Sequence, residues 1–159
     1  MKLILASQNR HKAQEMQAIL GDKITLVTLD DVGCADIEII EDGDTFEQNA
    51  IKKAVTVMQA TGLPSIADDS GLCVDALGGA PGIYTARFAG EGATDDENIS
   101  KLLKELDGVE TAKRTARFVC VIAVAYPAES PKPFAVSARV LFLPKSAGKT
   151  ALDMILCFM

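Results

Sequence analysis

The chain has 159 residues, 48% of them apolar and 24% charged, which is typical of a folded globular protein and excludes a disordered or disulfide-dependent chain. Its formal net charge of −6 argues against nucleic-acid binding, because contacts to phosphates dominate that affinity. No apolar stretch is long enough to cross a membrane and the N-terminal one is too short for a signal peptide, so we expect a cytoplasmic protein.

The first part of the chain predicts strands alternating with helices. Continuous apolar runs indicate buried strands, and apolar residues at helical spacing indicate helices. Thr45 and Gln48 have the spacing of a capping box, and Gly62 supplies a helix stop. The elements expected there are a strand at 2–6, a helix at 11–20, a strand at 24–29, a helix at 45–61 and a short strand at 65–67.

The second part mixes irregular sequence with further elements. Thr94 and Glu97 form another capping box. The elements expected there are a structured Gly- and Pro-rich loop at 71–92, a helix at 94–106 and a hairpin of strands at 117–126 and 134–143. Together the elements predict an α/β fold, a mixed twisted sheet flanked by helices, in one domain over residues 1–159 with its cleft at strand ends.

The cysteines are widely spaced, with no CxxC pair and only one His in the chain. This spacing argues against a zinc site. Because each Cys has apolar neighbours, we expect buried, free thiols in a reducing compartment. The four are Cys34, Cys73, Cys120 and Cys157.

Residues Ser7 to Lys12 lie where the first strand meets the first helix, and they predict an anion site. Free backbone N–H groups and the helix dipole attract anions at such a helix N-terminus. Lys12 is a cation in the first turn, where the dipole disfavours it, and this invites a functional explanation. A plain N-cap followed by a solvated lysine explains the same residues, so both interpretations stay open.

Asp68 and Asp69 are expected to leave the end of a buried strand, where α/β sheets bind ligands. Adjacent carboxylates repel each other unless a cation or buried donors compensate them. Mg²⁺ prefers one or two carboxylates together with water and substrate phosphates. An Asx turn with one helix-capping acid is the alternative.

A second acidic cluster, Glu41 to Asp44, precedes the 45–61 helix, on which Asn49 and Lys53 are four residues apart and share a face. Its acids either complement the helix dipole, or Glu41 completes a metal site with Asp68 and Asp69. A phosphate-binding helix start with clustered carboxylates suggests metal-assisted phosphoryl chemistry.

Four segments carry a resemblance to a known family: LASQNRHK, EDGDTFEQNAIKKA, LPSIADDSGLCVDALGGAPGIYTARFAGEGATD and RTARFVCV. Over about residues 1–137 the chain resembles the inosine triphosphate pyrophosphatases, also called non-canonical purine NTP pyrophosphatases. The resemblance implies hydrolysis of ITP, dITP and XTP to a monophosphate and pyrophosphate with Mg²⁺. It also implies a homodimer that cleanses the nucleotide pool.

The resemblance implies roles for single residues as well. Asp69 would bind metal and act as the base that activates water, Glu41 would be a second metal ligand, and Asp68 would support the metal site. Arg87 is open between a phosphate ligand and a structural ion pair. The implied substrate-binding residues are Ser7, Gln8, Asn9, Arg10, His11, Lys12, Asn49, Lys53 and Ser70.

The C-terminal residues 138–159 depart from the family pattern. A G-F-G-Y-D-P motif, a lysine and a Ser-His-Arg motif, which hold the purine base in the family, are not visible there. Thr150 to Met159 can be back-translated with synonymous codons that read G-F-G-Y-D-P-M-F-Y in the neighbouring frame, and the genetic code leaves limited choice among them. We therefore hypothesise a frameshift between about Val136 and Leu141, which would leave the domain truncated; an unrelated natural tail is the alternative.

Three functions are compatible with these residues. The first is the purine nucleoside triphosphate pyrophosphatase, and the second is a related house-cleaning pyrophosphatase for pyrimidine or other modified nucleotides. The third is a truncated, non-catalytic fragment that binds phosphates. A substrate panel separates the two enzymes, and an activity assay separates both from the fragment.

Overall fold

The computed structural model describes residues 1–7, 10–127 and 136–142, with only the backbone described for Arg10, His11, Glu15 and 136–142. The helices are α1 (Arg10–Leu20), α2 (Phe46–Thr61) and α3 (Asp95–Glu105). The strands are β1 (Lys2–Leu5), β2 (Thr25–Val27), β3 (Ser65–Val74), β4 (Ala116–Ala125) and β5 (Val136–Phe142).

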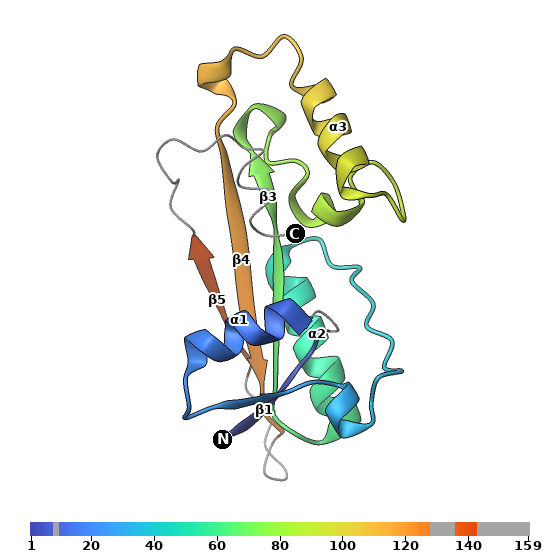
Figure 1. Ribbon diagram of the computed structural model, residues 1–159, viewed down its shortest axis with the longest axis vertical. Helices are drawn as coiled ribbons and strands as arrows, with labels where there is room; N and C mark the ends of the chain where they lie inside the picture. The colour runs from blue at the N-terminus through green and yellow to red at the C-terminus, as the bar shows by residue number, and fades with distance from the viewer. Residues whose placement is uncertain (8–9, 128–135, 143–159) are drawn as a thin grey trace. The chain divides into compact units, whose positions relative to one another are not determined.

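The strands form one sheet in the order β2-β1-β3-β4-β5 (Figure 1). β1 is parallel to both of its neighbours, with Lys2 opposite Thr25 and Leu5 opposite Ile66. In Figure 1 the arrow of β4 points opposite to the arrows of β3 and β5. The predicted mixed α/β sheet is therefore confirmed.

Two compact units divide the chain. The first comprises Met1–Asp69 with Val121–Val140, and the second comprises Ser70–Cys120 with Leu141–Met159. β3 and β4 each contribute residues to both units.

In the first unit, α1 and α2 cover opposite faces of β3. Ile66 packs with Leu3 and Leu5 of β1 in a buried cluster that includes apolar side chains of α1. The neighbouring Ser65 points the other way, because its hydroxyl donates a hydrogen bond to the Ala54 carbonyl of α2 at 2.5 Å. This alternation is the ordinary period of a strand, and it decides which helix each following side chain meets.

Both predicted helix N-caps are confirmed. The Thr45 hydroxyl accepts a hydrogen bond from the Gln48 N–H, and the Thr94 hydroxyl accepts one from the Glu97 N–H. The Glu97 carboxylate accepts in return from the Thr94 N–H at 2.8 Å, which completes a capping box. Gln48 differs, because its side chain accepts from the Asp44 N–H, one residue before the cap.

β3 is longer than the sequence predicts. The expected strand over 65–67 with a loop from residue 71 is wrong, since β3 continues to Val74. The added residues are strand because Leu72 and Val74 are buried beside Phe118 of β4, which offsets the low strand propensity of Gly71. The other elements begin and end within a residue or two of their predicted positions.

The second unit packs α3 against β3 and β4. Leu102 of α3 and Leu106, its C-cap, belong to one buried cluster with Leu72, Val74 and Phe118. The structured loop that was expected over 71–92 begins only after β3, and it contains 3-10 turns. Apolar burial of this kind is the main contribution to the stability of the unit.

The described cysteines are free thiols. Cys73 is buried, and this burial raises the pKa of its thiol. Cys34 and Cys120 are only half-buried, so the expectation of buried thiols is confirmed for Cys73 and wrong for these two. Cys157 lies outside the described residues.

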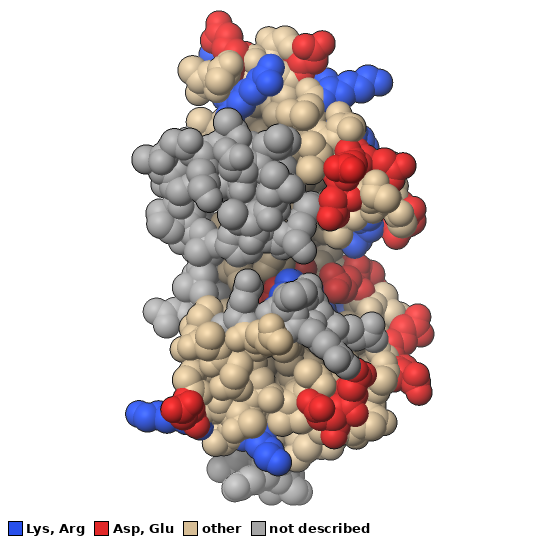
Figure 2. All heavy atoms as spheres, viewed as in Figure 1, with Lys and Arg blue, Asp and Glu red and all other residues tan. Residues whose placement is uncertain are grey.

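Acidic and basic side chains are interspersed on the described surface of the face drawn in Figure 2. Acidic residues outnumber basic ones in the full sequence, which gives the formal net charge of −6. None of the described helices combines the length and the apolar character needed to span a membrane.

Candidate active site

Asp68 and Asp69 are adjacent in β3, yet their side chains lie on opposite faces of the strand. Asp68 is on the α1 side, where its carboxylate accepts a hydrogen bond from Lys12 Nζ at 2.8 Å. Asp69 is on the α2 side, where it accepts from Asn49 Nδ2 at 3.1 Å and from Lys53 Nζ at 3.5 Å. Each of these buried acids therefore has its own cation.

The two acids follow the end of the parallel pairing between β1 and β3. The Ala6 N–H, just after β1, donates to the Ile66 carbonyl at 2.8 Å. Asp68 lies two residues after this pairing and Asp69 follows it, at the carboxyl edge of β1, where parallel sheets bind ligands. The acids thus lie in the middle of β3 but at the end of its parallel neighbour.

Lys53 joins two carboxylates that come from distant parts of the chain. Its Nζ is 3.0 Å from Glu41 Oε1 and 3.5 Å from Asp69 Oδ1. The Lys53 side chain is 10% exposed, whereas that of Glu41 is 38% exposed. Glu41 and Asp69 therefore converge on one cation at the boundary between the interior and solvent.

Burial dominates the electrostatics of Asp69. Desolvation raises the pKa of this carboxyl above its ordinary value, against the opposing effects of the Lys53 charge and the Asn49 hydrogen bond, while the Glu41 charge raises the pKa further. A carboxylate with a raised pKa holds a proton more readily, which suits a general base. Asp69 is therefore a candidate for proton transfer at this site.

Asn49 is buried beneath the acidic segment that precedes α2 and is 1% exposed. Its Oδ1 accepts a hydrogen bond from the Gly43 N–H at 2.8 Å, while its Nδ2 donates to Asp69. The side chain thus links the backbone next to Glu41 with the Asp69 carboxylate.

The structure brings the predicted residues together in two groups. One is the pair Lys12 and Asp68, and the other contains Glu41, Asn49, Lys53 and Asp69. Ser7 follows β1 and is half-buried, as is Ser70, which belongs to the second unit. The predicted site residues Gln8 and Asn9, and the side chains of Arg10 and His11, lie outside the described part of the chain.

Sequence reasoning missed Gly43. A Cβ at this position would lie 2.7 Å from Asn49 Oδ1 and 2.8 Å from Gln48 Cβ, so only glycine lets the backbone approach Asn49 this closely. The signal was available, because Gly43 is the one glycine within the acidic cluster.

The carboxylate chemistry fits a divalent cation. Glu41 and Asp69 supply two oxygen donors around a position that already attracts a cation, and Mg²⁺ uses one or two carboxylates in nucleotide sites. Within the described residues, no three Asp, Glu, His or Cys side chains form a metal-binding group. The metal roles of Glu41, Asp68 and Asp69 stay predictions.

Arg87 has local partners in the second unit. Its Nε is 3.5 Å from Glu91 Oε1, and its guanidinium lies over the Tyr84 ring at 5.3 Å from the centroid. Of the two interpretations of Arg87, these contacts favour the structural ion pair.

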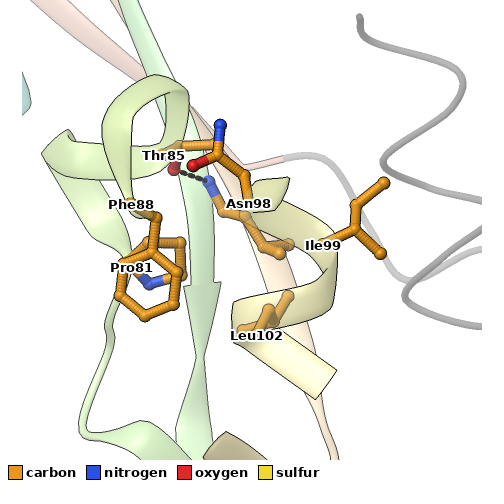
Figure 3. Close-up of a pocket in the computed structure, with 7 residues that line it drawn as sticks. Pro81, Thr85, Phe88, Asn98, Ile99 and Leu102 are labelled. Carbon is orange, nitrogen blue, oxygen red and sulfur yellow. Dashed lines mark hydrogen bonds between the residues drawn. The ribbon is translucent and has the colours of Figure 1, made fainter. Parts of the chain in front are cut away.

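A small apolar pocket also lies in the second unit (Figure 3). Its polar side chains bond within the unit: Thr85 accepts from the Leu72 N–H and donates to the Gly82 carbonyl, and the Asn98 amide bonds to the main chain. The pocket is therefore a feature of packing around α3. Its lining residues are Leu72, Pro81, Thr85, Phe88, Asn98, Ile99 and Leu102.

The fold, with one group of residues around Asp68 and another around Asp69, defines an α/β protein that has a polar site at the carboxyl edge of its parallel strands. A family model described as the Ham1 family matches residues 3–153. The chain belongs to the Ham1 family.

Two relatives and two solved structures give the degree of similarity. The chain is 52% identical over 126 residues to a dITP/XTP pyrophosphatase of Shouchella clausii, which covers 79% of this chain and 63% of the relative. It is 50% identical over 133 residues to a dITP/XTP pyrophosphatase of Shigella flexneri, which covers 83% and 66%. The chain thus spans less than two thirds of the length of each relative.

The Ham1 protein of Staphylococcus aureus superposes with a TM-score of 0.73 at 37% identity, over 89% of this chain and 70% of that one. The HAM1 protein of Coxiella burnetii gives a TM-score of 0.73 at 40% identity, over 89% and 71%. The fold described above is therefore that of the Ham1 proteins.

Proposed function

We propose that the chain is a nucleoside triphosphate pyrophosphatase that hydrolyses the purine nucleotides ITP, dITP and XTP to a monophosphate and pyrophosphate. The observation that carries this proposal is the buried Asp69 carboxylate, held by Asn49 and Lys53 beside Glu41. Membership of the Ham1 family and relatives named dITP/XTP pyrophosphatase support the substrate class.

In the proposed reaction, Asp69 accepts a proton from the water whose oxygen attacks the α-phosphorus. The bond from the α-phosphorus to the bridging oxygen breaks, and pyrophosphate leaves with that oxygen. Lys12 and the N-terminal turn of α1 attract the triphosphate. The Lys53 ammonium, already beside Asp69, supplies a further positive charge for the phosphates.

We infer Mg²⁺ as the cofactor, held by Glu41 and Asp69 and supported by Asp68. Bound there, Mg²⁺ supplies a positive charge that offsets the negative charge of the phosphates. We also infer a cytoplasmic homodimer. Size-exclusion chromatography with light scattering tests the dimer, and a monomeric mass would contradict it.

The deciding experiment is pyrophosphate release from ITP, XTP and GTP with Mg²⁺, on protein of confirmed intact mass. We expect ITP and XTP to be hydrolysed in preference to GTP. Asp69→Asn should lower the rate by about 10²- to 10⁴-fold, the usual contribution of a general base. Asp107→Asn, an acid in the turn after α3, is the matched control and should retain the wild-type rate.

Two other outcomes have definite meanings. Preference for a modified pyrimidine nucleotide would indicate the related house-cleaning enzyme. A folded protein that binds the triphosphate without releasing pyrophosphate would indicate the non-catalytic fragment.

A further inference from the structure

The sequence places two asparagines at equivalent positions of two capped helices. Asn49 stands four residues after the N-cap Thr45 of α2, and Asn98 stands four residues after the N-cap Thr94 of α3. Both are buried, with exposures of 1% and 5%. The two asparagines therefore share their helix position and their burial. They differ in the hydrogen-bond partners of their side-chain amides.

Asn98 connects main chain to main chain. Its Oδ1 accepts from the Ala89 N–H at 2.7 Å, and its Nδ2 donates to the Ala86 carbonyl at 3.1 Å. Both partners belong to the segment between β3 and α3. Asn98 thus has the bonding pattern of a purely structural residue, because its amide satisfies backbone groups of its own unit.

The Asn49 amide bonds to the main chain through its oxygen and to a side chain through its nitrogen. Its Oδ1 accepts from the Gly43 N–H, as Asn98 accepts from Ala89, but its Nδ2 donates to a carboxylate, Asp69 Oδ2. The Gly43 N–H fixes the amide, because only the oxygen of Asn49 can accept that bond. The NH₂ group must then face Asp69.

We propose that Asn49 is the positioning residue of Asp69. This inference rests on the proposed role of Asp69 as the base. The family resemblance instead implies that Asn49 contacts the nucleotide. Asn49 holds Oδ2, and Lys53, one helical turn later on the same face of α2, lies at Oδ1. Each of the two oxygens of the Asp69 carboxylate thereby has a partner on α2.

The same side chain also holds the acidic segment. Through the Gly43 N–H, Asn49 fixes the backbone two residues from Glu41, whose carboxylate meets Lys53. The two acids of the site, 28 positions apart in sequence (69 minus 41), are thus held by Asn49 and Lys53 together. A substrate contact alone would not require Asn49 to be buried to 1% exposure.

The test is Asn49→Asp, assayed by pyrophosphate release. Aspartate keeps the size and the acceptor for Gly43 but turns a carboxylate oxygen toward Asp69 in place of the donor. We expect kcat to fall about 10- to 100-fold, as for the loss of a hydrogen bond to a charged group, while KM for ITP stays within about threefold. A rise in KM with unchanged kcat would identify a substrate contact and overturn the proposal.

Asn98→Asp is the matched control. It makes the same exchange at the same helix position, and it places a carboxylate against a backbone carbonyl instead of a carboxylate of the site. We expect it to lower stability and leave kcat per folded molecule unchanged. An equal loss of kcat in both variants would show a general structural role and overturn the positioning role of Asn49.

Crystal structures of the wild type and of Asn49→Ser provide a readout that does not depend on activity, and Ser serves where Asp disrupts folding. The shorter hydroxyl side chain should leave the Asp69 carboxylate rotated away from its wild-type orientation. An unchanged orientation would overturn the inference. An inactive wild type whose Asp69 rotates in Asn49→Ser would refute the proposed function and still support the positioning role.

Discussion

Asp68 and Asp69 show how two identical neighbours acquire different chemistry. Asp68 pairs with Lys12, whose side chain is 39% exposed, so solvent screens that pair. Asp69 meets two partners from α2, Lys53 at 10% exposure and a buried amide. Even with this support, burial keeps the pKa of Asp69 raised. The α2 face of β3 is thus where the buried carboxylate with the raised pKa lies.

Gly43→Ala is predicted to damage the site without removing any polar group. The new Cβ would lie 2.7 Å from Asn49 Oδ1 and 2.8 Å from Gln48 Cβ, and Asn49 is held in place by Asp69. We expect the free energy of unfolding in urea to fall by about 1–3 kcal/mol, as for overpacking, and kcat to fall as well. Asp44→Ala, on the next exposed residue, is the control. Wild-type stability and kcat in Gly43→Ala would contradict the close approach.

At the level of elements, the sequence predicted those features that depend on interactions between residues close together in the chain. The N-caps at Thr45 and Thr94 were predictable, because a side chain three residues from its partner needs no tertiary information. The length of β3 was not. Gly71 and the glycines after it are typical of a loop, and only the burial of Leu72 and Val74 beside β4 extends the strand.

The capping box of α3 predicts a dependence of stability on pH. Glu97 accepts hydrogen bonds from the Thr94 N–H and hydroxyl, and these lower the pKa of Glu97 below its usual value of 4.5. Its contribution is therefore fully present above about pH 4.5 and is lost as the pH falls through the lower folded-state value. The urea midpoint of Glu97→Gln should lie below that of the wild type at pH 7, and the gap should close toward pH 3.

A constant gap between Glu97→Gln and the wild type at every pH would contradict the charged capping box. Thr94→Ala tests the same box from the other side. Removal of this N-cap should lower the free energy of unfolding by about 1 kcal/mol. That loss should appear in urea titrations at neutral pH.

At the scale of the molecule, the two units hold different parts of the protein. The site residues that contact one another belong to the first unit, and the apolar core around α3 belongs to the second. Leu102→Ala removes a side chain that is 4% exposed in that core. We expect a loss of about 2–5 kcal/mol in urea unfolding, as for other buried leucines. Hydrogen exchange should show the largest loss of protection in α3. Unchanged exchange there would contradict the assignment of Leu102 to the core.

The motifs identified most residues of the site, but not their partners. Glu41, Lys53 and Asp69 were predicted to share a cleft, and the structure brings them together. The pairing of Lys12 with Asp68 and of Lys53 with Asp69 was not predictable from the sequence. The choice depends on which helix covers which face of β3, and on the path of the irregular segment that carries Glu41, which has no periodicity to follow.

The alternation of β3 also constrains how this part of the chain can change in length. A single residue inserted or deleted between Ser65 and Asp68 would transfer each acid to the opposite helix, so that Lys12 would face the wrong carboxylate. A change of two residues would preserve the faces. Gaps of odd length in this stretch should therefore be absent from alignments of functional relatives, even where gaps of even length occur.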